Sequence, residues 1–87
     1  MKYAVVWSPH AEQELARLWL MASDRPVVTK AAFQIEQSLE NQPSERGESR
    51  SAGRRILLEP PLGVTFEVLT NPRIVRVLTV WRFDQHR

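Results

Sequence analysis

The architecture of this chain is signalled most clearly by residues 54–68, Arg54-Arg55-Ile56-Leu57-Leu58-Glu59-Pro60-Pro61-Leu62-Gly63-Val64-Thr65-Phe66-Glu67-Val68. Two apolar runs of strand length are separated there by a proline pair, and neither proline can donate to a sheet ladder. A third run, residues 76–82, follows the turn signal Asn71-Pro72. Because short connections join antiparallel neighbours, we expect three such strands. Their expected ranges are about Arg54–Glu59, Val64–Thr70 and Arg73–Phe83.

The N-terminal residues predict a strand and then a helix. Lys2–Trp7 alternates in a residue mix that favours a pleated, mostly buried surface. Ser8 is placed as an N-cap, and Pro9 occupies the first helical position, where its missing N–H is not needed. The apolar residues that follow recur at helical spacing. They are Ala11, Leu15, Leu18, Trp19 and Ala22.

A second helix is predicted after an interruption at residues 23–26. Asp24 is placed to cap this helix, and Pro43 ends it beyond about Asn41. Two helices with so short a link should fold back as a hairpin. The stretch Gln42–Gly53 has little apolar content and is predicted to be a mobile loop. The second helix has its apolar face at Val28, Ala31 or Ala32, Ile35 and Leu39.

These elements predict an α+β fold with the order β-α-α-β-β-β. A chain of 87 residues forms one domain, so residues 1–87 are expected to share one core. The first strand must join a sheet whose other members come much later in the chain. We therefore expect an antiparallel sheet with the helical hairpin packed on one face and the opposite face partly open.

Composition narrows the cellular setting. The chain has no cysteine, so neither a disulfide nor a thiolate zinc site is expected, and a reducing compartment is compatible. No apolar run approaches the roughly 18 residues that span a bilayer, and the N-terminus lacks the apolar core of a signal peptide. No spacing of His, Asp or Glu suggests a metal ion, and no cofactor is expected. A cytoplasmic protein without a membrane partner is the resulting expectation.

The charges are distributed unevenly along the chain. Residues 1–42 carry four Lys or Arg against five Asp or Glu, whereas residues 43–87 carry eight against five. All eight C-terminal cations are arginine, whose planar fork matches phosphate geometry better than a lysine does. The C-terminal half thus brings most of the cations, and a polyanionic partner is expected.

Period-two alternation suggests which charged side chains share one side of the sheet. On the last strand, Arg76 and Arg82 fall in one set, and Glu67 lies on the middle strand. If these residues share the open face with Arg54 or Arg55, they form a cationic groove that suits an RNA backbone. The alternative for Glu67 is a simple cross-strand ion pair with Arg76.

These features resemble the RelE/ParE superfamily of type II toxin–antitoxin toxins. The resemblance rests on the element order and on loose motifs across nearly the whole chain. RelE-like members are ribosome-dependent mRNA endonucleases, whereas ParE-like members poison DNA gyrase and lack the nuclease residues. Both kinds are neutralised by a cognate antitoxin protein. The matching segments are Trp7-Ser8-Pro9-His10-Ala11, Arg54-Arg55-Ile56-Leu57, Pro61-Leu62-Gly63-Val64-Thr65-Phe66-Glu67-Val68 and Val77-Leu78-Thr79-Val80-Trp81.

From this resemblance we expect a toxin that cleaves mRNA at the ribosome, and the resemblance implies roles for a small set of residues in that reaction. Arg54 and Arg82 match its basic positions, but Gly63 stands where that branch has an arginine. Arg76 is the candidate replacement for the missing cation. RNA cleavage by the 2′-OH also needs groups that accept and donate protons, and those candidates are Glu67, Glu59 and His86.

Two other functions remain open at this point. A gyrase poison or a degenerate toxin-fold binding protein is favoured by Gly63 and by the sparse set of acid–base residues. An unrelated RNA-binding or partner-binding α+β domain is the third possibility. It would use Trp7, Trp19 and Trp81 as exposed stacking platforms.

Overall fold

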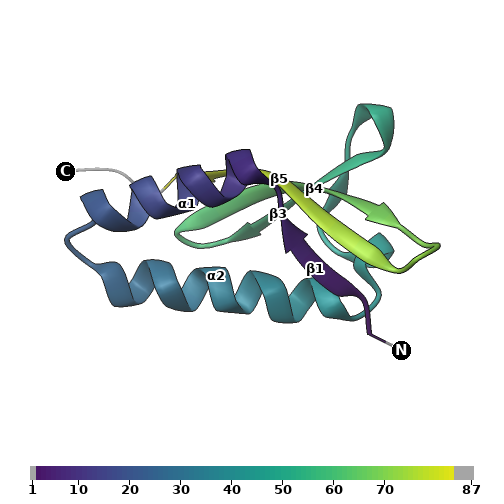
Figure 1. Cartoon of the computed structure of the whole chain (residues 1–87), viewed down its shortest axis with the longest axis horizontal. Coiled ribbons are helices and arrows are strands. Elements are labelled where there is room, and N and C mark those ends of the chain that lie inside the picture. The colour runs from purple at the N-terminus through teal and green to yellow at the C-terminus, as the bar shows by residue number, and fades with distance from the viewer. Residues whose placement is uncertain (1, 84–87) are drawn as a thin grey trace.

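The computed structural model describes residues 2–83, in which two helices cover one face of a five-stranded sheet (Figure 1). The predicted α+β class is confirmed, as is the order of the predicted elements, to which the structure adds the short strand β2. Helix α1 (Pro9–Met21) and helix α2 (Arg25–Glu40) run antiparallel beside each other. The strands are β1 (Ala4–Trp7), β2 (Glu48–Ser49), β3 (Arg54–Glu59), β4 (Leu62–Leu69) and β5 (Ile74–Arg82).

The sheet has the strand order β1-β5-β4-β3-β2, and one pairing differs from the prediction. Strands β2 to β5 pair antiparallel as neighbours, but β1 runs parallel to β5, with Ala4 opposite Ile74. The sheet is therefore mixed and not wholly antiparallel. Alternation of apolar residues within β1 indicates only which side chains are buried. It does not indicate whether β1 pairs parallel or antiparallel with a strand that is distant in the sequence.

The stretch predicted as a loop, residues 42–53, contains regular structure. Two 3-10 turns, Pro43–Glu45 and Ser51–Gly53, flank the short strand β2. The Arg46 guanidinium donates to the carbonyl of Asn41 at 3.0 Å, and Arg55 donates to the carbonyl of Arg46 at 2.8 Å. These bonds hold the base of the segment against α2 and β3.

The core lies between the helices and the sheet face that they cover. Its side chains follow the predicted helical and strand alternation, and Phe66 and Ile35 are the largest of them. No described helix has both the length and the apolar character needed to cross a bilayer. The buried apolar residues are Ala11, Val28, Ala31, Ile35, Leu39, Leu62, Val64, Phe66, Val75, Val77 and Val80.

A β-bulge interrupts strand β5. Thr79 pairs with Thr65 and Val77 pairs with Phe66, so Leu78 between them has no partner on β4. An extra residue shifts the side-chain alternation by one, because successive residues point to opposite faces. Two odd-numbered residues of β5, one before Leu78 and one after it, therefore lie on opposite faces of the sheet. The same holds for two even-numbered residues.

Ser8 joins this bulge to the start of α1. Its hydroxyl donates to the Leu78 carbonyl at 3.2 Å and accepts from the Ala11 backbone N–H at 3.1 Å. The Ser8 backbone N–H also donates to the Val77 carbonyl at 2.9 Å. One residue thus caps the helix, as predicted, and donates to the carbonyl of the residue that bulges from β5.

Asp24 also has a role that its position did not predict. It precedes α2, but its side chain makes no capping hydrogen bond. Its two carboxylate oxygens instead accept from the two terminal nitrogens of Arg82, at 2.9 and 2.7 Å. This bidentate pair ties the end of β5 to the turn between the helices, and it lowers the pKa of the Asp24 carboxyl.

Replacing Ser8 separates its two hydrogen-bonding functions. We expect Ser8→Ala to lower the free energy of unfolding by about 0.5–2 kcal/mol from the lost cap alone. Ser8→Asp keeps the capping acceptor but cannot donate to Leu78, so it should recover only part of the loss. Ser8→Thr keeps both functions and is the control. Urea unfolding of the four proteins measures this order, and equal stability of the Ala and Asp variants would contradict it.

The Asp24–Arg82 pair predicts a pH dependence of stability. Because the folded pKa of Asp24 is lowered, the unfolded chain takes up this proton first as the pH falls. The stabilisation is present above the unfolded pKa of about 3.9 and is lost as the pH falls below it. Asp24→Asn should therefore flatten the acid limb of a plot of unfolding free energy against pH.

Repeating the Asp24→Asn substitution in a protein that lacks Arg82 tests whether the Asp24–Arg82 pair causes this change. In an Arg82→Gln protein the partner is absent, so Asp24→Asn should change the acid limb much less than it does in the wild-type protein. The same change of slope in both backgrounds would show that Arg82 is not the cause. Urea unfolding at several pH values between about 2 and 6 covers the range in which this stabilisation is lost.

Candidate functional site

Three of the predicted site residues meet on the open face of the sheet. Glu67 on β4 lies opposite Arg54 on β3 and opposite Arg76 on β5. Arg76 donates to one Glu67 carboxylate oxygen at 2.8 Å, and the Arg54 Nε lies 4.0 Å from the other. We call these three residues the Arg–Glu–Arg cluster. Both arginine side chains are about half exposed, at 49% and 47%.

The charges of this cluster partly cancel. Two guanidinium groups share a single carboxylate, so the cluster keeps one net positive charge. A guanidinium has five N–H donors, and one carboxylate cannot use those of both arginines. The cluster can therefore hold an external carboxylate or phosphate while Glu67 stays in place. The Glu67–Arg76 contact is also the cross-strand ion pair that was the alternative prediction, of the kind worth about 0.2–1 kcal/mol.

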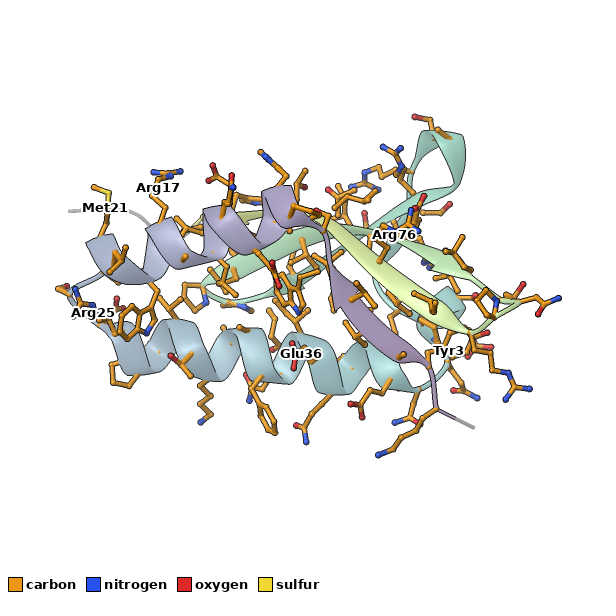
Figure 2. All side chains as sticks on the ribbon, viewed as in Figure 1. Tyr3, Arg17, Met21, Arg25, Glu36 and Arg76 are labelled. Carbon is orange, nitrogen blue, oxygen red and sulfur yellow. The ribbon has the colours of Figure 1, made fainter. Side chains whose placement is uncertain are left out.

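Arg82 does not join this cluster, and its expected place on the open face is wrong. The bulge at Leu78 puts Arg82 on the same side of the sheet as its register partner Leu62, which is buried under the helices. Its side chain is only 14% exposed and binds Asp24. Figure 2 shows Arg76 far along the molecule from the helical turn that holds this pair. The burial pattern along β5 agrees with this change, because the buried positions shift from Val75 and Val77 to Val80.

The remaining predicted residues also have separate positions. Glu59 pairs with Leu62 on the side of the sheet that faces the helices. Arg55 lies on that same side, where it donates to the carbonyls of Arg46 and Gly47. His86 lies outside the described residues, so its expected role in proton transfer stays a prediction.

Gly63 has a packing partner that sequence reasoning missed. It lies opposite Trp81 on β5 and Leu58 on β3, on the open face. A Cβ atom at position 63 would come within 2.6 Å of the Trp81 ring and 2.9 Å of the Leu58 side chain. The indole therefore covers the glycine, and the glycine leaves the space that the ring needs. Glycine in a strand, followed later by an aromatic residue on the next strand, is the available sequence signal.

The three tryptophans are not equivalent exposed platforms. The Trp7 indole N–H donates to the Glu36 carboxylate at 2.7 Å and joins β1 to α2. The Trp19 indole N–H donates to the Thr29 hydroxyl at 3.1 Å between the helices. Trp81 is partly buried over Gly63. Only Trp81 thus belongs to the open face that carries the Arg–Glu–Arg cluster.

No protein-family model and no curated protein sequence matches this chain. Its similarity to known proteins is therefore a similarity of three-dimensional structure. Among solved structures, the toxin–antitoxin complex RelBE2 from Mycobacterium tuberculosis is similar, with a TM-score of 0.76 and 15% identity. The match covers 98% of this chain and 95% of that chain.

Two further structures are similar over nearly their whole length. The chromosomal ParDE toxin–antitoxin system from P. aeruginosa has a TM-score of 0.71 at 18% identity, covering 94% of this chain and 97% of that one. A mutant of the E. coli toxin RelE in its free state has a TM-score of 0.71 at 16% identity, covering 97% and 86%. Identities this low do not separate RelE from ParE. The resemblance seen in the sequence is confirmed at the level of architecture: this chain has the fold of the RelE and ParE toxins.

Proposed function

We propose that this chain is the toxin of a type II toxin–antitoxin pair and is neutralised by a cognate antitoxin. The observation that carries the proposal is the match of 94–98% of the chain to structures of toxin–antitoxin systems. The same matches cover 95% and 97% of those two chains, so little of either chain lies outside the shared fold. The exposed arginines of the Arg–Glu–Arg cluster on the open face support an active protein.

We further propose that the toxin acts by binding its target, as a ParE-like gyrase poison does, and not by cutting mRNA. Cleavage needs cations that converge on a phosphorane and a free acid–base group beside them. In the described part of the open face, Glu67 already accepts from Arg76, and Arg82 is held at the helical turn. Position 63, which carries arginine in the nuclease branch, lies under Trp81.

The Arg–Glu–Arg cluster is the proposed contact with the target. Arg54 and Arg76 present spare N–H donors from β3 and β5, the strands on either side of β4, and Glu67 on β4 forms an ion pair with each of them. Such a preorganised pair favours a rigid acidic or phosphate group on the target, because less side-chain entropy is lost on binding. DNA gyrase is the target that the resemblance supplies for a toxin of this kind.

The first test is growth arrest. Induced expression of the chain in a bacterial host should stop growth, and the Arg54→Gln, Arg76→Gln double variant should restore it. Arg17→Gln is the matched control, since Arg17 is also an exposed arginine paired with a glutamate, but it lies on α1. Continued growth with the wild-type chain would contradict the toxin proposal.

The second measurement separates the two targets. Purified protein should inhibit supercoiling by gyrase and should leave transcripts on translating ribosomes intact. The double variant should lose the inhibition, while Arg17→Gln keeps it. Ribosome-dependent cleavage without an effect on gyrase would overturn the binding mode and favour the mRNA endonuclease.

The packing of Trp81 on Gly63 can be tested by placing a side chain at position 63. We expect Gly63→Arg to lower the free energy of unfolding by about 1–3 kcal/mol, because the new Cβ overlaps the indole. In a Trp81→Ala background the same substitution should cost less. Urea unfolding of the four proteins in this double-mutant cycle measures the coupling. An equal cost in both backgrounds would show that Trp81 does not exclude a side chain at position 63.

A further inference from the structure

The carboxylate of Glu67 lies in the middle of the Arg–Glu–Arg cluster. Its strand β4 runs between β3 and β5, and Glu67 pairs in register with Arg54 on one side and with Arg76 on the other. Because neighbouring strands are about 4.8 Å apart, the two arginines are about 10 Å apart at the backbone. A group that contacts both guanidinium groups therefore also lies close to the Glu67 carboxylate.

The two arginines are not equally engaged by that carboxylate. Arg76 donates to Glu67 at 2.8 Å, whereas the Arg54 Nε lies 4.0 Å from the other carboxylate oxygen, beyond hydrogen-bond distance. The Arg54 side chain is half exposed, and the planar fork of a guanidinium binds one carboxylate through two parallel N–H groups. Arg54 is therefore the member of the cluster that can bind an external anion without displacing Glu67.

The open face provides no continuous row of cations for a chain of phosphates. Proteins hold single-stranded nucleic acid in a positively charged groove that follows the backbone. On the open face of strands β3, β4 and β5, within the described residues, Arg54 and Arg76 are the only cations. The carboxylate of Glu67 separates them, so a polyanion would meet a negative charge at the centre of the site.

Apolar side chains cover much of the remaining open face. Trp81 lies over Gly63, and Leu58 beside them is 55% exposed. Val6 on β1 lies opposite Arg76 and is 45% exposed. Aromatic residues and arginine are enriched in protein–protein interfaces, where they contribute much of the binding energy. The composition of this face therefore suits a protein surface better than a nucleic-acid backbone.

The net charge of the cluster determines which anion fits best. The cluster keeps one positive charge, which a single carboxylate neutralises. A phosphate monoester brings a charge of about −1.5 to −2, and a nucleic-acid backbone repeats its charge at every nucleotide. Each charge beyond the first is repelled by Glu67 without a further cation to compensate it.

We propose that Glu67 is a specificity-determining residue that restricts the open face to a single carboxylate on a protein partner and excludes a nucleic-acid backbone. Arg54 binds the carboxylate, and neighbouring apolar side chains of the partner cover Trp81 and Leu58. The inference rests on the proposed function, in which the toxin binds a protein target, and it adds the chemical group that the toxin recognises. Glu67 then acts by repulsion and not by proton transfer.

The first experiment measures the affinity for a fluorescent single-stranded RNA of about 10 nucleotides by anisotropy. Glu67→Gln should bind this RNA at least about tenfold more tightly than the wild-type protein does. Its affinity should also fall more steeply with salt, by about 0.7 in the logarithmic slope for each additional phosphate that it neutralises. Glu67→Asp keeps the negative charge and should bind as weakly as the wild type.

Glu14→Gln is the matched control for net charge. Glu14 accepts from Arg17 at 2.6 Å on α1, so this substitution removes the same charge and also releases an exposed arginine. Arg17 and Arg76 are well separated along the molecule (Figure 2). Because charges that far apart are screened, the RNA affinity of Glu14→Gln should stay within about twofold of the wild type. Equal gains in Glu14→Gln and Glu67→Gln would contradict the proposal.

The second experiment compares three peptides of about seven residues that differ at one position, which holds glutamate, glutamine or phosphoserine. A leucine follows four residues later, because an extended chain then spans the length of about 13 Å between Glu67 and Gly63. Binding is followed by the NMR signal of the Trp81 indole N–H. The wild-type protein should bind the glutamate peptide at least about fivefold more tightly than the glutamine peptide, and more tightly than the phosphoserine peptide. In Glu67→Gln, the phosphoserine peptide should become the tightest of the three.

Three results would overturn the proposal. Tight RNA binding by the wild-type protein that Glu67→Gln does not improve would assign the open face to nucleic acid. A wild-type preference for the phosphoserine peptide would make the cluster a phosphate site. Equal binding of the glutamate and glutamine peptides would show that no carboxylate is recognised. None of these measurements uses growth or gyrase, so a chain that fails to arrest growth but shows the reversed peptide order would contradict the toxin proposal alone.

Discussion

Ser8 connects the start of helix α1 to the bulge in strand β5, and the rest of the structure depends on this connection. Its hydroxyl accepts from the first turn of α1 and donates to the carbonyl of Leu78, the residue that bulges from β5. The bulge inverts the facing of every later residue on the strand. A single side chain therefore holds the start of α1 against the bulge of β5, and the face to which each later side chain of β5 points depends on that bulge.

Because of the bulge, the two arginines of β5 lie on opposite faces of the sheet and have different partners. Before the bulge, Arg76 points to the open face and meets Glu67 and Arg54. After the bulge, Arg82 points toward the helices and binds Asp24 at the hairpin turn. One cation therefore serves an exposed cluster that can bind a partner. The other stabilises the attachment of the helices, where it no longer contributes to a convergent set of cations.

The open face and the helical hairpin also differ in the groups that they expose. The open face offers fixed hydrogen-bond donors with partly compensated charge, which favours a specific anionic group. The helical hairpin exposes apolar side chains, Leu20 and Phe33 among them, with Arg25 and Lys30 nearby.

Local patterns in the sequence were sufficient for the elements and much of the core. Helical spacing and strand alternation depend on residues close together in the chain, so α1, α2 and β3 to β5 were predicted within a few residues, as was the cap at Ser8. The parallel pairing of β1, the unpaired Leu78 and the burial of Gly63 beneath Trp81 were decided only by the tertiary structure. Each depends on the register between strands, which is determined by the packing of distant segments and leaves no periodic signal in any one of them.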